Sequence, residues 1–176
     1  MSCPICQKEH AFTLSQAIAR MAAMPKRLER LISRSTPQRV GARPAPNKWS
    51  AKEVVSHLAD GELVYGMRYR KILAEPGSAL VAFDQDAWAQ GLNYRGLPVK
   101  HPLASFSALR AAHIALFKSL PQSAWGKSGR HPEYGELTLR HLVVHLSDHD
   151  DNHLAQVERL CPPTNPKPPK KAPGKR

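Results

Sequence analysis

The sequence predicts an all-α protein built as a bundle of four helices with one long connection. An apolar seam at alternating steps of three and four residues runs through residues 139–160, and a second amphipathic helix opens at Ser50. Hydrophobic residues make up 41% of the 176, enough for the core of a single domain. We therefore expect a flexible N-terminal segment at 1–11, the bundle domain at 12–160, and a disordered basic tail at 161–176.

The first two helices follow from capping and proline signals. A helix at about residues 12–34 should bend near Pro25, because the proline ring removes one backbone hydrogen bond. The proline-rich stretch Pro37–Pro46 is expected to be a loop. The second helix should run from Ser50 to Ala74, because Glu53 completes a capping box with Ser50 and a Pro-Gly pair follows the helix.

A connection of about 25 residues separates the second helix from the third and ends near His101. Connections of this length tend to be functional or disordered, and the aromatic residues here favour order. Trp88, Tyr94 and Arg95 could line the mouth of a functional site, with Arg95 binding an anion. Ordinary packing of Trp88 and Tyr94 is the alternative.

The second half of the chain contains two more helices. A helix is expected at Pro102–Leu120, followed by a loop that holds Trp125, His131 and Tyr134. The last helix is expected at Leu137–Leu160. One long crossover among shorter connections is a recognised topology for a helix bundle.

Three histidines lie on the predicted buried faces of two helices. His149 and His153 occupy the seam of the last helix, where residues four apart lie one above the other, and His57 lies on the apolar face of the second helix. Two imidazoles that point into a core are hard to satisfy by hydrogen bonds, since each brings a donor and an acceptor. The pattern favours binding of one metal ion by the three rings over hydrogen-bonded core histidines.

Other polar residues near these histidines are candidates for supporting roles. His141 and His145 precede His149 at intervals of four residues on the same helix. Four residues turn the helix about 40° beyond one full turn, so successive histidines move gradually off the apolar seam. We therefore expect His141 on the polar side of the helix and His145 at its border, as surface residues or as residues that support the ligands. Gln156 lies on the seam and is a second supporting candidate.

Two carboxylates stand close to the histidines in sequence. Asp60 follows His57 by three residues and Asp150 directly follows His149, so either could orient a ligating ring. Together with Arg95 they are the weak catalytic candidates, although a solvated carboxylate on the helix surface is the alternative for both. The H-D-D-N-H run resembles the metalloprotease H-E-x-x-H, but Asp150 is shorter than Glu and no third-ligand pattern follows.

Three segments carry a resemblance to a known family: W-S-A-K-E-V-V-S-H-L-A-D at 49–60, G-E-L-T-L-R-H-L-V-V-H at 135–145, and H-D-D-N-H-L-A-Q-V at 149–157. They resemble the DinB-like superfamily of metal-dependent hydrolases and thiol transferases, over about residues 12–160. This resemblance implies an antiparallel four-helix bundle that binds a divalent ion, zinc or nickel, with water in the open positions. It also implies a homodimer.

Carried over position by position, the resemblance assigns the ligands to His57, His149 and His153. An ion held by three neutral imidazoles can lower the pKa of bound water to about 7 or stabilise a thiolate. The implied reaction is hydrolysis, or transfer of a low-molecular-weight thiol as cosubstrate, on a small electrophilic substrate. The alternative is a metal- or ligand-binding stress-response bundle without turnover.

The charge distribution argues against specific nucleic-acid binding. The formal net charge is +12, and the tail from Cys161 onward carries five basic residues, six prolines and no acid, which leaves +7 on the rest. No helix shows a dense basic face interleaved with aromatics. No apolar run is long enough to span a membrane and no signal peptide is recognisable, so we expect a cytoplasmic protein.

The N-terminal run C-P-I-C-x-x-x-H could be half of a zinc site. Cys3, Cys6 and His10 would supply three ligands, and Cys161 could be a fourth if the chain ends meet. No second ligand pair at a defined spacing is visible, so two reduced thiols in a flexible segment are the preferred interpretation. A Cys3–Cys6 disulfide or a redox role is a weaker alternative.

Overall fold

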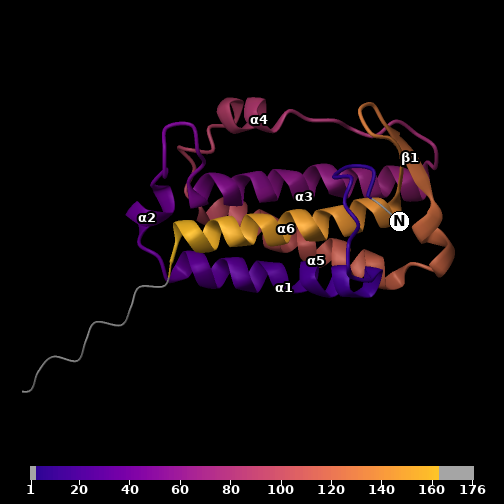
Figure 1. Cartoon of the computed structure of the whole chain (residues 1–176), viewed down its shortest axis with the longest axis horizontal. Helices are drawn as coiled ribbons and strands as arrows, with labels where there is room; N and C mark the ends of the chain where they lie inside the picture. Colours follow the sequence, from indigo (N-terminus) through magenta and orange to yellow (C-terminus); the bar gives the residue numbers. More distant parts are fainter. Residues whose placement is uncertain (1–2, 163–176) are drawn as a thin grey trace, which may run out of the picture.

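The computed structural model describes residues 3–162 and shows a bundle of four long helices (Figure 1). These are α1 (Leu14–Ser33), α3 (Ala51–Ala74), α5 (Lys100–Ser119) and α6 (Leu139–Leu160). The predicted fold class is therefore confirmed, and the helix boundaries differ from the expected ones by about two residues. Within α1 the helix continues through Pro25.

The four helices pack in a closed ring rather than in sequence order. α6 lies between α1 and α3, while α5 contacts the same two helices from the other side. Helices α3 and α5 run in one direction, and α1 and α6 run in the opposite direction (Figure 1). Because neighbouring parallel helices need a connection that returns along their full length, the long segment between α3 and α5 is a crossover.

Three short helices lie in segments that we expected to be irregular. α2 (Pro37–Gly41) occupies the predicted proline-rich loop, where Thr36 caps the helix and Pro37 supplies the favoured first residue. α4 (Gln85–Gly91) lies in the crossover and is capped by Asp84. The third is a single 3-10 turn, η1 (Gln122–Gly126). Prolines that rule out a helix interior are compatible with a helix start, which is why the loop prediction was wrong for α2.

A β-hairpin replaces the predicted loop before α6. It consists of β1 (Ser128–His131) and β2 (Gly135–Thr138), and it displaces the start of the last helix from Leu137 to Leu139. The crossover joins this hairpin, since the Leu80 amide donates to the Arg130 carbonyl at 2.8 Å. A Cβ at Gly129 would lie 2.6 Å from the Leu80 side chain, so this close approach requires glycine.

From Cys3 onward, the N-terminal segment is folded onto the bundle. Cys3 is only 3% exposed. Its backbone amide donates to the Lys8 carbonyl at 2.8 Å, which closes a tight turn. Cys161 is at the far end of α6, about 24 Å along the helix from His145 at 1.5 Å per residue. It therefore cannot join the N-terminal cysteines as a ligand. The predicted basic tail lies outside the described residues from position 163 onward.

The start of α3 is fixed by an ion pair as well as by its capping box. The Ser50 hydroxyl accepts from the Glu53 amide, and the Glu53 carboxylate accepts from the Ser50 amide at 2.9 Å. The Arg43 guanidinium also donates to this carboxylate, at 2.9 Å from Nε to Oε2. Burial alone raises the pKa of Glu53, but the hydrogen bonds from Arg43 and Ser50 outweigh burial and lower it to about 2.

We expect Glu53→Gln to remove acid-sensitive stability. The folded-state pKa of Glu53 lies below its ordinary value of 4.5, so its contribution is complete above pH 4.5 and is lost as the pH falls toward 2. The loss at pH 7 should be on the order of 2 kcal/mol and should shrink in acid. Denaturant unfolding at several pH values measures it, with Glu75→Gln as the control because Glu75 forms an exposed pair with Lys71. Parallel pH profiles for wild type and Glu53→Gln would contradict this account.

Candidate metal centre

Three imidazoles from two helices converge in the interior of the bundle. The Nε2 atom of His149 lies 3.1 Å from Nε2 of His57 and 3.1 Å from Nε2 of His153. The ligand atoms of all three rings are within 4.8 Å of one another. In a tetrahedron, metal–nitrogen bonds of 2.0–2.1 Å place neighbouring ligand nitrogens about 3.3–3.4 Å apart, so the observed separations are close to those around a shared ion.

Two of the three rings are held by residues close to them in sequence. Trp49, which directly precedes the cap of α3, packs its ring on His57 with a centroid distance of 5.1 Å. On α6, Nδ1 of His153 donates to Oε1 of Gln156 at 2.9 Å, which leaves Nε2 as the atom with the lone pair. The structure thus places Gln156 in contact with a candidate ligand.

The protonation states also suit metal binding. Burial, reinforced by the charge of His153, lowers the pKa of His57 to about 3, and burial with the neighbouring histidines holds the pKa of His149 well below its ordinary value. Burial also lowers the pKa of His153. All three rings are therefore neutral at pH 7, and a neutral imidazole is the form that ligates metals.

Hydrogen bonding alone does not account for this cluster. One ring nitrogen carries either a proton or a lone pair, so Nε2 of His149 cannot make good hydrogen bonds to both neighbouring nitrogens. In addition, Nδ1 of His57 and Nδ1 of His149 are buried without a hydrogen-bond partner among residues 3–162. A cation bound to the three Nε2 atoms would turn both short contacts into favourable interactions, so the residues fit a metal ion.

A hollow of about 260 Å³ opens beside the histidines. His57 and His149 line it together with residues from α3, the crossover, β1 and the turn of the hairpin. These include Gly61, Tyr65, Arg68, Phe83, His131 and Tyr134. Its volume suits a small molecule rather than a polymer segment.

Arg68 is a residue of this hollow that the sequence analysis missed. Its Nε donates to the Val81 carbonyl at 2.8 Å, its Nη2 lies 3.1 Å from Nε2 of His131, and its guanidinium lies over the Tyr65 ring. The available signal was the spacing: the face that carries His57 continues at steps of four, four and three residues to Arg68. The guanidinium places a permanent positive charge beside the candidate metal centre.

The crossover residues Trp88 and Tyr94 make ordinary packing contacts, which was one of the two expectations. Phe83 lines the hollow, and the Trp88 ring packs on the Phe83 ring with 5.1 Å between centroids. Tyr94 is buried and donates a hydrogen bond to Asp60. Asp60 and Tyr94 line another hollow, and Arg95 is exposed, with its carbonyl accepting from Lys52. Catalytic roles for Asp60 and Arg95 stay predictions, and the shape of the hollow does not favour them.

Asp150 is not the solvated surface carboxylate that was the alternative expectation. It is 2% exposed, and its Oδ2 accepts from Nη1 of Arg110 on α5 at 2.6 Å. The same guanidinium donates from Nη2 to Oε2 of Glu62 at 2.6 Å, and His113 contacts the other oxygen of Glu62. The sequence could not reveal this network because its members come from three different helices.

The two outer histidines of α6 have separate surroundings. His141 is the third residue of the helix, and its side chain accepts from the Thr138 amide in a capping box. His145 is half-buried, stacks on Tyr65 with 6.4 Å between ring centroids, and lies 6.3 Å from the His149 ring. Burial lowers the pKa of His145 to about 4.

Comparison with known families settles the membership of the chain. The DinB superfamily model matches residues 20–157, which is most of the chain. The protein belongs to the DinB superfamily. The resemblance carried by the tryptophan-containing and histidine-containing segments is thereby confirmed.

Relatives of this DinB protein carry names that refer to metal-dependent hydrolysis. A protein of Oceanobacillus iheyensis named "Putative metal-dependent hydrolase" is 26% identical over 113 residues, 64% of this chain and 65% of that relative, slightly less than two thirds of its length. One of the same designation from Geobacillus kaustophilus is 26% identical over 156 residues, 88% of this chain and 87% of the relative.

A solved structure agrees with the fold. YfiT from Bacillus subtilis, described as "a probable metal-dependent hydrolase with an unusual four-helix bundle topology", superposes with a TM-score of 0.75 at 22% identity. The match covers 90% of this chain and 95% of YfiT. At this identity the likeness establishes the shared bundle.

Proposed function

We propose that this DinB protein is a metal-dependent hydrolase or thiol transferase that acts on a small electrophilic molecule. The observation that carries the proposal is the convergence of three neutral imidazole nitrogens beside a hollow of small-molecule size. His57, His149 and His153 would hold the ion, zinc or nickel. When bound, a divalent ion supplies Lewis acidity that lowers the pKa of a water molecule or thiol to near neutrality.

The protein's own residues would bind and orient the substrate. Arg68 presents a positive charge that suits an anionic or carbonyl-bearing substrate, and its contacts with Val81 and Tyr65 fix its position. Phe83 from the crossover and Tyr134 from the hairpin turn provide apolar ring surface in the hollow. Trp49 packs against His57 and so shields the ligand that comes from α3.

The experiment is metal removal with two readouts. Protein purified with its metal is assayed with a p-nitrophenyl ester for hydrolysis, and with glutathione and chlorodinitrobenzene for thiol transfer. It is then treated with a chelator, while circular dichroism follows the helices. We expect loss of turnover, recovery on return of zinc or nickel, and an unchanged helical signal, because the core and the Arg110 network also join α3, α5 and α6.

Two other results would contradict this proposal. Loss of helical signal on chelation, with no detectable reaction, would mean that the ion only stabilises the fold of the bundle, as in a non-catalytic stress protein. Turnover that is unaffected by complete metal removal would exclude metal-dependent chemistry.

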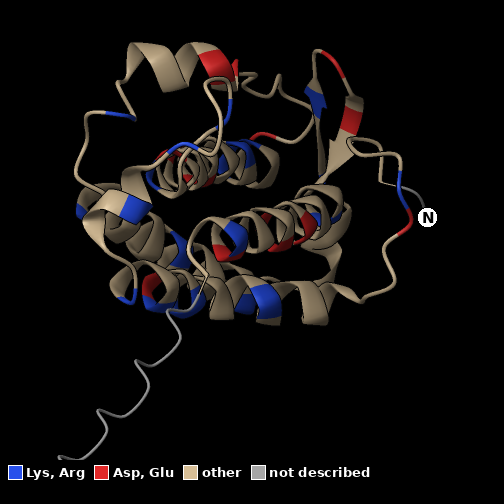
Figure 2. Ribbon diagram, turned by 60° about the vertical axis from the view of Figure 1, so that its left-hand side comes forward, with Lys and Arg blue, Asp and Glu red and all other residues tan. Residues whose placement is uncertain are grey.

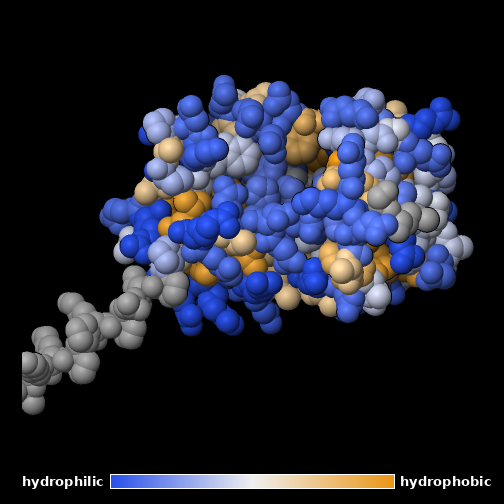
Figure 3. All heavy atoms as spheres, viewed as in Figure 1, coloured by the Kyte–Doolittle hydropathy of each residue, from blue (hydrophilic) through white to orange (hydrophobic). Residues whose placement is uncertain are grey.

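The proposed partners are a small molecule and a second copy of the chain. We propose a small-molecule substrate and a homodimer, the latter because Leu63 and Met67 expose apolar surface on α3, one turn apart, at 52% and 51%. The face in Figure 3 is largely hydrophilic, with small separate apolar patches. Light scattering of the purified protein beside Leu63→Lys tests the dimer.

Nucleic acid and membrane are not among the proposed partners. In the described part of the chain, basic residues are scattered over several helices and loops with acidic ones among them (Figure 2). Within residues 3–162, no helix combines the length and apolar character that crossing a membrane requires.

A further inference from the structure

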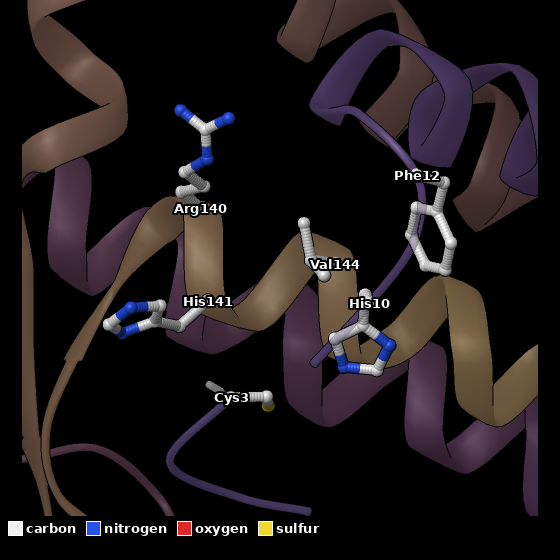
Figure 4. Close-up of a pocket in the computed structure, with 6 residues that line it drawn as sticks. All are labelled: Cys3, His10, Phe12, Arg140, His141 and Val144. Atoms are coloured by element: carbon white, nitrogen blue, oxygen red, sulfur yellow. The ribbon is translucent and has the colours of Figure 1, made fainter. Parts of the chain in front are cut away.

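The N-terminal segment brings two cysteines to a histidine near the start of α6, with a second histidine beside one of the cysteines. The Sγ atom of Cys3 lies 3.8 Å from Nδ1 of His145, and the Sγ atom of Cys6 lies 3.4 Å from Nε2 of His10. The ligand atoms of Cys3, Cys6 and His145 are all within 4.8 Å of one another. Figure 4 shows Cys3 and His10 on the irregular N-terminal segment, beside α6.

We propose that Cys3, Cys6 and His145 form a second metal site, of the zinc type, separate from the three-histidine centre, and that His10 moves in from its contact with Cys6 as the fourth ligand. Zinc bonds of about 2.3 Å to sulfur and about 2.0–2.1 Å to nitrogen in a tetrahedron place sulfur and nitrogen about 3.5 Å apart. The observed sulfur–nitrogen separations of 3.8 and 3.4 Å match this geometry. His145 supplies the ligand that the sequence pattern lacked.

The backbone of the segment presents both thiols to the same point. The Gln7 amide donates to the Cys3 carbonyl and the Cys3 amide donates to the Lys8 carbonyl, each at 2.8 Å, so residues 3–8 form a tight turn. Gln7 closes the turn in the left-handed region at φ 57°, which costs a residue with a side chain about 1–2 kcal/mol. The two cysteines are free, not joined in a disulfide. Such a turn is typical of the C-x-x-C half of a zinc site.

His10 is oriented for the same role. Its side chain is 6% exposed, and its Nδ1 lies 3.9 Å from Oδ1 of Asp148 on α6. This separation is too long for a hydrogen bond, but it places a carboxylate near the ring nitrogen that does not contact Cys6. The Phe12 ring packs on the His10 ring, with 5.3 Å between the ring centroids.

The site would connect the N-terminal segment to the three-histidine centre. Ile5, between the two cysteines, lines the hollow that contains His57 and His149. His145 neighbours the His149 ring and stacks on Tyr65, a second residue of that hollow. A metal bound by the four ligands would therefore hold one wall of the hollow in place. As each metal–sulfur bond forms, the thiol releases its proton to solvent, so binding liberates up to two protons.

Cobalt(II) substitution tests the site without an activity assay. Reduced, metal-free protein is titrated with Co²⁺, because only thiolate ligands produce sulfur-to-cobalt charge-transfer absorption in the near ultraviolet. We expect two bound equivalents and this absorption in the wild type. Cys6→Ser and Cys3→Ser should each lose the absorption and one equivalent. Cys161→Ser, the control for a buried cysteine elsewhere, should retain both.

The variants also separate this proposal from the proposed function. His149→Ala should retain the charge-transfer band while it loses the other equivalent, so failure of one site does not imply failure of the other. His10→Ala should weaken Co²⁺ binding and alter the band, and circular dichroism confirms that each variant is folded. Absence of the band in reduced wild type, or its persistence in folded Cys3→Ser and Cys6→Ser proteins, would overturn the second site.

Discussion

Replacement of Arg110 by methionine is expected to lower the free energy of unfolding by about 3–5 kcal/mol at pH 7. The Arg110 side chain is 1% exposed and pairs with Glu62 and Asp150, each at 2.6 Å. Methionine fills a similar volume but leaves two buried carboxylates without their cation. Removal of one partner from a buried charge network costs this much because the remaining charge stays desolvated.

The pH dependence identifies the cause. Burial already raises the pKa of Asp150 to about 6 against the influence of Arg110. Without Arg110 the folded-state pKa of Asp150 should rise further. The pKa of Glu62, which His113 and Arg110 hold below its ordinary value against the effect of burial, should also rise, while the unfolded values of both carboxyls stay near 4. The destabilisation should therefore be largest above the raised pKa values and should shrink as the pH falls toward 4, where the carboxyls take up protons in the folded state.

Chemical denaturation at pH 7.5 and pH 5 measures both effects. Arg20→Met is the matched control, since Arg20 pairs with Asp151 at 3.2 Å on the surface with 45% of its side chain exposed. Exposed pairs of this kind contribute about 1 kcal/mol or less. Equal losses for the two variants, or a loss in Arg110→Met that does not change with pH, would show that the buried pairs do not stabilise the bundle as described.

This network also explains how the ligand-bearing helices are kept in register. Glu62 is one and a half turns after His57 on α3, Asp150 directly follows His149 on α6, and Arg110 bridges them from α5. A shift of α3 would break the contacts of Glu62 with Arg110 and His113, and a shift of α6 would break the contact of Asp150 with Arg110. The candidate metal centre therefore depends on α5, although α5 supplies none of the three histidines.

Local signals in the sequence predicted the long helices because helix ends and apolar stripes depend on neighbouring residues. Ser50 and Glu53 form the capping box that the sequence predicted, and the seam of α6 is buried at Leu142 and Leu146. The hairpin before α6 was missed because its four-residue strands pair partly with the distant Ser78 and Leu80. Pairing of that kind leaves no local pattern.

The same distinction applies to the candidate sites. His149 and His153 share a helix face, so their proximity follows from a four-residue spacing. The choice of His57 as their partner rested on its place on the apolar face of another helix and on the family resemblance, and the packing of α3 against α6 brings the rings together. The partnership of Cys3 with His145 spans 142 residues, and the sequence suggested Cys161 instead, because the spacing pattern alone could not say which part of α6 the N-terminus reaches.

His149→Ala is expected to weaken metal binding at the three-histidine centre by well over 100-fold, and to reduce any metal-dependent turnover to a similar extent. Loss of residues that only support a ligand typically costs 10–100-fold, so loss of a ligand should cost more. His149 has the central position, since its Nε2 is 3.1 Å from both of the other ligand atoms. Its removal leaves His57 and His153 as a pair across two helices.

A graded series gives this prediction its controls. Gln156→Leu removes the acceptor of the His153 Nδ1 proton and should lower the affinity by about 10–100-fold, because the ring keeps its place but loses its fixed tautomer. His141→Ala, at a capping position on the same helix, should leave the affinity unchanged. Isothermal titration with Zn²⁺ and Ni²⁺, on protein carrying Cys6→Ser so that the N-terminal cluster does not contribute, measures all three. Metal binding by His149→Ala as tight as that of His141→Ala would rule out the three histidines as the ligands.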